Sequence, residues 1–120
     1  MNKQKALQYV CENEIIGIKA GIKRDTFLDI WMVVVNNRIF ARSWGFAEKS
    51  WYNSFLKDSF GQIKCGGDVF NINACIPADL DDLTLSINSA YLTKYSTKQY
   101  AKPITEGKHV EKTMEFIIGE

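Results

Sequence analysis

The sequence contains one histidine, His109, and three cysteines, none of which belongs to a Cys-x-x-Cys pair. A zinc site built from several histidines, or a Ser-His-Asp triad, would therefore need unusual partners, and we predict no metal site. An odd number of cysteines argues against a disulfide framework, so each thiol is expected to be a small buried group. Reduced thiols fit the cytoplasm, where we expect the protein to be located.

Strong charge of either sign and long apolar runs are also absent. The chain has 15 Lys and Arg against 14 Asp and Glu, a formal net charge of +1. No basic footprint therefore points to nucleic acid or to a membrane surface. The apolar stretches are too short to span a membrane, the first residues lack the pattern of a signal peptide, and the glycine patterns of phosphate-binding loops are missing.

The 120 residues, 46% of them hydrophobic, are enough for one domain that buries a core unaided. Hydrophobic periodicity predicts an α+β domain with mostly antiparallel strands. The predicted helices are 2–12, 48–57 and one that starts at Asp79 and carries Leu83, Ile87, Tyr91 and Tyr95. The predicted strands are 16–22, 27–35, one that starts at Arg38, 62–65, 68–73 and 113–118, with a loop over 98–108.

Two short turns fix the expected strand register. Asn36-Asn37 and Gly66-Gly67 both suit two-residue hairpin turns, because these residues adopt positive φ. The first turn predicts the pairs Val35 with Arg38, Val33 with Phe40 and Trp31 with Arg42 on one face, and Val34 with Ile39, Met32 with Ala41 and Ile30 with Ser43 on the other. The second face is uniformly small or apolar until Ser43, so we expect it to form the core.

Arg42 is the first candidate for a functional residue. It follows Phe40 and precedes Trp44 on the same strand, with Trp31 expected opposite. An arginine among aromatic rings can stack on them while its guanidinium binds a phosphate or carboxylate. An arginine whose stem covers aromatic surface and whose head lies in water is an equal alternative.

Ser43, Lys49 and Ser50 flank the loop between this strand and the next helix. Backbone N–H groups at a helix start, with a hydroxyl and an ammonium, can bind an anion. The plainer interpretation, that a serine caps the helix, is favoured from spacing alone. Arg24, in the preceding turn, either reaches a ligand or is simply solvated.

Aromatic residues mark two helices. Trp51 is expected in the core, and Tyr52 is expected either to line a pocket or to pack on another subunit. Tyr91, Lys94 and Tyr95 form another aromatic and basic group, whose plain interpretation is an amphipathic helix face.

Three stretches carry a resemblance to known proteins: A-R-S-W-G-x-x-x-K-S-W-Y, I-x-C-G-G-D and I-N-S-A-Y-L-T-K-Y. The chain resembles a small bacterial family of uncharacterised proteins over residues 16–115. That family is similar in turn to the flavin-binding split β-barrels, which include pyridoxamine-phosphate oxidases and deazaflavin-dependent nitroreductases. The resemblance implies a single domain over residues 1–120, a six-stranded antiparallel split barrel with flanking helices, and a homodimer.

The resemblance also implies a flavin, FMN rather than a deazaflavin, and oxidoreductase chemistry supplied by that cofactor. The residues it assigns to the flavin are Arg24, Arg42, Ser43, Trp44, Lys49, Ser50, Trp51 and Tyr52, and it assigns no acid or base. Phe46 and Glu48 replace the glycine-rich loop and proline of the nitroreductases. They favour an alternative without a cofactor, a non-catalytic module that binds another anionic or aromatic small molecule. A third alternative is a dimeric interaction protein whose aromatic sheet face is only a subunit interface.

Overall fold

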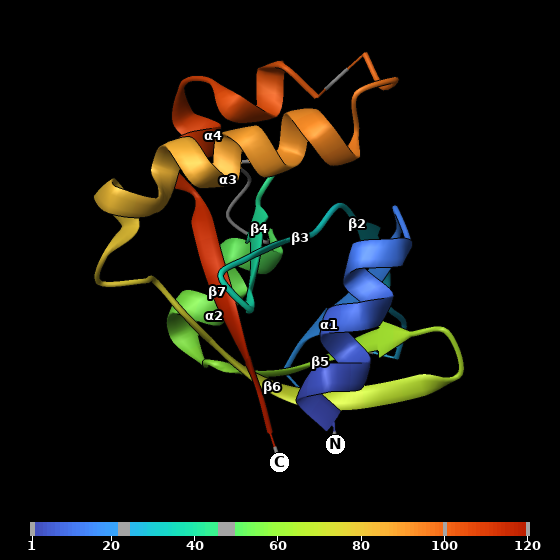
Figure 1. Cartoon of the computed structure of the whole chain (residues 1–120). Coiled ribbons are helices and arrows are strands. Elements are labelled where there is room, and N and C mark those ends of the chain that lie inside the picture. The colour runs from blue at the N-terminus through green and yellow to red at the C-terminus, as the bar shows by residue number, and fades with distance from the viewer. Residues whose placement is uncertain (1, 22–24, 46–49, 100, 120) are drawn as a thin grey trace.

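The computed structural model describes residues 2–21, 25–45, 50–99 and 101–119, which form an antiparallel sheet with helices around it (Figure 1). The predicted α+β class is confirmed. In chain order the elements are α1 (Asn2–Glu12), β1 (Ile16–Ala20), β2 (Leu28–Ile30), β3 (Val33–Val35), β4 (Arg38–Arg42), α2 (Trp51–Lys57), β5 (Phe60–Cys65), β6 (Asp68–Cys75), α3 (Leu80–Lys94), the 3₁₀ helix η1 (Pro103–Thr105), α4 (Lys108–Glu111) and β7 (Thr113–Ile118).

The seven strands lie in the order β2-β1-β5-β6-β7-β4-β3, with antiparallel neighbours throughout. The two edge strands, β2 and β3, are consecutive in the chain and are separated by Trp31 and Met32 alone. The chain therefore passes directly from one edge of the sheet to the other, and the sheet curls into a half-barrel. Six strands were predicted, and seven are present because one predicted strand is divided.

The prediction of one continuous strand over residues 27–35 is wrong. The first half of this stretch, β2, pairs with β1, and its second half, β3, pairs with β4. The predicted pairs Val33 with Phe40 and Val35 with Arg38 are confirmed, and so is the turn, where Asn36 and Asn37 have φ of 54° and 61°. The pairs predicted beyond them do not form: Trp31 with Arg42, Met32 with Ala41, and Ile30 with Ser43.

Side chains on both faces of β4 are buried, in two apolar clusters. Ile39 and Ala41 join the main cluster, which α1 and α2 cover, as predicted for this face. Phe40 lies on the opposite face with Val33, and there α3 and η1 provide the cover. Figure 1 shows α3 crossing this end of the molecule above β3 and β4.

Helix α2 begins at Trp51, with Ser50 as its N-cap. Trp51 is buried as predicted, and so is Phe55 one turn later, whereas Leu56 is 53% exposed because adjacent helix positions point to different sides. Gly61 lets α2 lie close to the sheet, since a Cβ there would be 2.6 Å from both the Lys19 carbonyl oxygen and the Phe55 ring. Within the described ranges, no helix has the length and apolar character that crossing a membrane requires.

The last third of the chain returns to the middle of the sheet. The stretch predicted as a loop over 98–108 contains η1, which starts at Pro103, a residue suited to a first helical position. The predicted closing strand is confirmed as β7, and it lies between β6 and β4 rather than at an edge. Asn2 Nδ2 donates to the Gly119 carbonyl at 3.3 Å, so both ends of the described chain meet.

Candidate functional site

Arg42, at the end of β4, is buried, with 3% of its surface exposed. Its Nε donates to Thr113 Oγ1 at 3.1 Å, and Nη1 donates to Asn88 Oδ1 at 2.5 Å and to the Ile104 carbonyl at 3.3 Å. Nη2 donates to the Thr84 carbonyl at 3.4 Å. Burial lowers the pKa of this guanidinium. Arg42 therefore joins β4 to α3, η1 and β7 through acceptors of the chain itself.

Ser43 and Trp44 follow Arg42 but differ in exposure. Ser43 is 1% exposed, and its hydroxyl donates to the Gly45 carbonyl at 2.5 Å. Its own carbonyl lies 3.0 Å from Nδ1 of His109. Trp44 is half exposed and stacks on the His109 ring, with centroids 4.7 Å apart and an angle of 9° between the ring planes.

The remaining described residues of the predicted flavin site serve α2 and the core. Ser50 Oγ accepts from the Asn53 N–H at 3.3 Å, which is the capping role that spacing alone favoured. Trp51 and Tyr52 are buried in the main cluster, and burial raises the pKa of Tyr52. The predictions for Arg24 and Lys49 lie outside the described residues.

A flavin phosphate needs donors that a ligand can reach. Arg42 and Ser43 donate instead to the chain itself and are almost fully buried. These described residues therefore do not fit a phosphate in this conformation, and flavin binding stays a prediction. The two grooves described below are lined by other residues.

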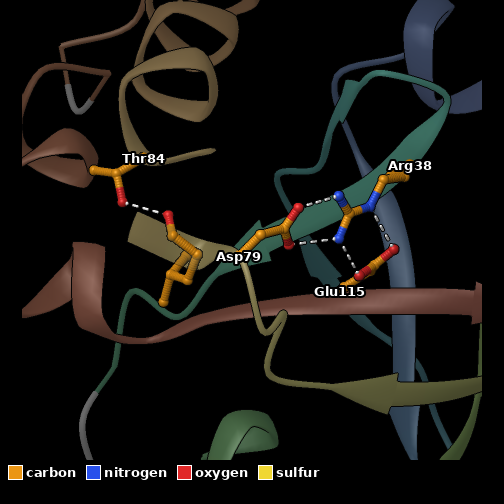
Figure 2. Close-up of polar contacts among 5 residues, drawn as sticks. Arg38, Asp79, Thr84 and Glu115 are labelled. Carbon is orange, nitrogen blue, oxygen red and sulfur yellow. Dashed lines mark hydrogen bonds and ion pairs between the residues drawn. The ribbon is translucent and has the colours of Figure 1, made fainter. Parts of the chain in front are cut away.

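Arg38, at the start of β4, forms the most extensive ion-pair network of the described residues (Figure 2). Nη1 and Nη2 donate to the two carboxylate oxygens of Asp79 at 2.9 and 3.0 Å, and Nε and Nη2 donate to those of Glu115 at 3.0 and 2.9 Å. Both carboxylates raise the pKa of Arg38, and the Arg38 hydrogen bonds lower that of Asp79. These contacts use four of the five guanidinium N–H bonds, so we assign Arg38 to holding the start of α3 on the sheet.

A groove of about 830 Å³ lies between α1, β3 and α3. Its volume is within the range typical of small-molecule sites. Its lining residues are Cys11, Val33, Val34, Val35, Asn36, Leu85, Ser86, Ser89, Ala90, Thr93 and Lys94. The α3 members recur with helical spacing over about 14 Å of helix axis, so the groove is elongated. Apolar side chains and small hydroxyl-bearing ones alternate along it.

Lys94, in the last turn of α3, is partly buried at this groove. Its Nζ donates to the Val10 carbonyl, in the last turn of α1, and to the Met32 carbonyl at 2.6 Å. Burial lowers the pKa of Lys94 to about 8, although Cys11 and Glu14 act in the opposite direction. Of the groove residues described, Lys94 is the one that carries a charge.

The neighbour of Lys94 supports the same part of the chain. Tyr95 is fully buried and stacks on Trp31 at 4.3 Å between centroids. Its hydroxyl accepts from the Met32 N–H at 3.1 Å and reaches the carbonyls of Glu14 at 2.6 Å and of Met32 at 3.2 Å. Lys94 and Tyr95 together therefore satisfy the backbone where the strand 27–35 is divided.

A second groove, of about 570 Å³, lies near β1 and the β5–β6 turn, and its lining includes Asp25, Asp29 and Lys64. Lys19 and Lys64 place their ammonium groups 4.7 and 6.0 Å from the Phe27 ring centroid. The charged residues of this second groove, Asp25, Asp29 and Lys64, are all exposed, unlike Lys94 in the first. Among the residues that the structure describes, no cluster of three or more His, Cys, Asp or Glu side chains is arranged to hold a metal ion.

Sequence reasoning grouped Tyr91, Lys94 and Tyr95 but did not find the groove. The basic residue amid tyrosines was the available signal, and an amphipathic helix explains the same pattern. The groove depends on β3 being an edge strand with α1 beside it, which is a property of the sheet order.

Comparison with known proteins places the chain in a family. Residues 6–116 match the family described as uncharacterized protein conserved in bacteria (DUF2255). No curated protein and no solved structure matches the chain. The chain therefore belongs to this bacterial family, and the wider similarity to flavin-binding split barrels stays a prediction.

Proposed function

We propose that this member of the DUF2255 family is a binding module, and that its groove between α1, β3 and α3 holds an elongated, mainly apolar small molecule with an anionic end group. The carrying observation is a partly buried ammonium, that of Lys94, in a groove whose other lining residues are neutral. Carboxylate is the simplest anion that meets this description.

The groove offers separate contacts for the two parts of such a ligand. Val33, Val34, Val35, Leu85 and Ala90 provide apolar surface for a chain. Each methylene that they remove from water contributes about 0.8 kcal/mol. Two N–H bonds of Lys94 are directed to backbone carbonyls, and the ammonium has a third for a ligand oxygen. A charge-assisted hydrogen bond of this kind contributes about 1.5–3 kcal/mol.

Titration calorimetry with octanoate tests the proposal, with octylamine as a probe of equal chain length and opposite charge. We expect saturable binding of octanoate and much weaker binding of octylamine, since the ammonium repels a second cation. Ser89→Trp fills the groove from an exposed position of α3 and should abolish binding. Leu92→Trp adds the same ring on α3 at an exposed residue that does not line the groove, and should bind as the wild type does.

Equal octanoate binding by both tryptophan variants, or none by the wild type, would refute the proposal. The predicted flavin is tested in the same preparation by its visible absorbance and by quenching of added FMN. The predicted homodimer is tested by light scattering coupled to gel filtration. Saturable FMN quenching that Ser89→Trp leaves unchanged would place a flavin elsewhere and revive the oxidoreductase prediction.

A further inference from the structure

The hydrogen bonds of Lys94 leave one position of its nitrogen unused. An uncharged amine has two N–H bonds and one lone pair. Nζ already directs N–H bonds to the carbonyls of Val10 and Met32. When the amine is uncharged, the lone pair takes the position that a third N–H occupies in the ammonium. The backbone thus holds the nitrogen in an orientation that an uncharged amine satisfies completely.

The surroundings favour that uncharged form more than water does. Burial lowers the pKa of Lys94 to about 8. At pH 7 the uncharged amine is then on the order of a hundredfold more abundant at Lys94 than at a lysine with an ordinary pKa. The charged and titratable groups that act on it are Cys11 and Glu14, and the Tyr95 ring lies 5.1 Å from Nζ. Glu14 is itself 3.8 Å from Lys98.

A reaction at Lys94 requires that one backbone carbonyl lose its hydrogen bond from Nζ, and the Met32 carbonyl can do so. An iminium nitrogen keeps one N–H, so one of the two carbonyls must lose its lysine donor. The Met32 carbonyl also lies 3.2 Å from the Tyr95 hydroxyl. That hydroxyl has one proton and lies closer to the Glu14 carbonyl, at 2.6 Å. When Lys94 withdraws, the proton can turn from Glu14, which is an exposed residue, to the buried Met32 carbonyl.

We propose that Lys94 forms a reversible imine with the carbonyl carbon of an aldehyde whose apolar chain lies in the groove. This inference rests on the proposed function and adds aldehydes as a second class of ligand. The nitrogen lone pair attacks the carbonyl carbon, and the carbonyl π electrons move to its oxygen. Proton transfer from nitrogen to oxygen gives a carbinolamine. The hydroxyl then takes up a proton from the solvent and leaves as water, while the nitrogen lone pair forms the C=N bond. The product is a protonated imine, an iminium, which keeps one N–H. The step needs no oxidant or reductant.

The apolar lining supports this equilibrium in the direction of the imine. Val33, Val34 and Ala90 offer apolar surface on which the alkyl chain of the adduct packs, and burial of that chain stabilises the adduct relative to free aldehyde. Cys11 lines the same groove and is exposed, so its thiol is a competing nucleophile for the same aldehyde. A thiol adduct is not reduced by cyanoborohydride, whereas an iminium is converted to a stable secondary amine.

The test is trapping of octanal with sodium cyanoborohydride at pH 7, followed by peptide mass spectrometry. We expect the octyl group at Lys94 at least about tenfold above its level at exposed lysines such as Lys57 and Lys102, because the uncharged fraction decides the rate at this pH. Ser89→Trp should remove this preference, while Leu92→Trp and Cys11→Ser should keep it. Circular dichroism of each variant confirms its fold.

Uniform labelling of the lysines, or preference for Lys94 that survives Ser89→Trp, would overturn the inference. Binding of octanoate without preferential trapping of octanal at Lys94 refutes the imine and leaves the proposed function intact. Trapping at Lys94 without octanoate binding has the reverse meaning: the groove accepts aldehydes, and the anionic end group is wrong. Labelling at Lys94 should rise steeply from pH 7 to 8 and then level off.

Discussion

Arg42 is a cation surrounded by neutral acceptors, and its importance is therefore expected in stability. Three of its described acceptors are the Thr113 hydroxyl, the Asn88 amide and the Ile104 carbonyl. Arg42→Lys keeps the charge but cannot reach these diverging acceptors with one ammonium. We expect the free energy of unfolding, measured with urea, to fall by about 2–3 kcal/mol.

Lys102→Arg, a change between the same residue types at an exposed position, serves as the control and should alter stability little. A loss of less than about 0.5 kcal/mol in Arg42→Lys would mean that these contacts contribute little, as at an ordinary surface position. That result would restore Arg42 as a candidate for binding a ligand.

The lowered pKa of Lys94 predicts that the free energy of unfolding rises with pH. Its pKa is lowered from 10.5 to about 8, so the unfolded chain binds more protons than the folded one between these values. The free energy of unfolding should therefore increase over this window, by up to about 1 kcal/mol from pH 8 to 9. Urea unfolding of the wild type and of Lys94→Met at pH 7.5, 8, 8.5 and 9 measures the difference.

Other groups act in the opposite sense at higher pH. Burial raises the pKa of Cys65 to about 11 and that of Tyr91 to about 12, and it also raises the pKa of Tyr95. An acid whose folded pKa is raised loses its stabilising effect as pH rises above its unfolded value. These groups are common to both proteins, so they cancel in the comparison. Parallel pH profiles for the wild type and Lys94→Met would contradict the expectation.

Among the elements, the division of 27–35 into β2 and β3 depends on α3. Tyr95, which follows the last residue of α3, is more than sixty residues from Met32 in sequence. Its hydroxyl nevertheless accepts a hydrogen bond from the Met32 N–H at 3.1 Å. Tyr95→Phe removes that acceptor and the donor to the Glu14 carbonyl. We expect the free energy of unfolding to fall by about 1–3 kcal/mol, because buried polar groups lose their partners.

Hydrogen exchange provides a local readout of the same change. The Met32 amide should exchange faster in Tyr95→Phe, while amides in the ladder between β5 and β6, such as that of Phe70, should change only with global stability. Unchanged protection at Met32, relative to Phe70, would show that the strand break does not depend on the hydroxyl.

The sequence could predict features that depend on neighbouring residues, and it could not predict those that depend on distant contacts. The turn at Asn36-Asn37, the register next to it and the second hairpin are local, and their residue types decide them. The face of Ile39 and Ala41 was recognised from alternation alone. The strand break, the groove and the burial of Arg42 follow from side chains of α3, whose place over β3 and β4 no local pattern encodes. The flavin residues were assigned by resemblance alone. Those that the structure describes make hydrogen bonds or packing contacts within the protein.

At the scale of the whole molecule, β7 completes the sheet. It lies between β6 and β4, and all its residues except Ile117 are buried. A chain that ends after Lys112 leaves two new strand edges and an open core. We expect no cooperative urea transition for it, whereas a chain that ends after Gly119 should unfold as the full chain does. Circular dichroism and tryptophan fluorescence follow both transitions.

A synthetic peptide with the sequence of residues 113–119 extends the test. Added to the shortened chain, it should restore a cooperative transition, because it supplies the missing ladder partners of β4 and β6. A cooperative transition of the shortened chain by itself, with an m-value near that of the full chain, would contradict the prediction.

The place of β7 also has a consequence for synthesis in the cell. While a ribosome extends the chain, β4 and β6 emerge long before the strand that separates them, and their facing edges stay unpaired. Nascent chains with open edges and exposed apolar surface are prone to associate with one another. This protein should therefore depend on chaperones near the exit tunnel until β7 has been released, and rapid translation of the last strand should reduce its aggregation.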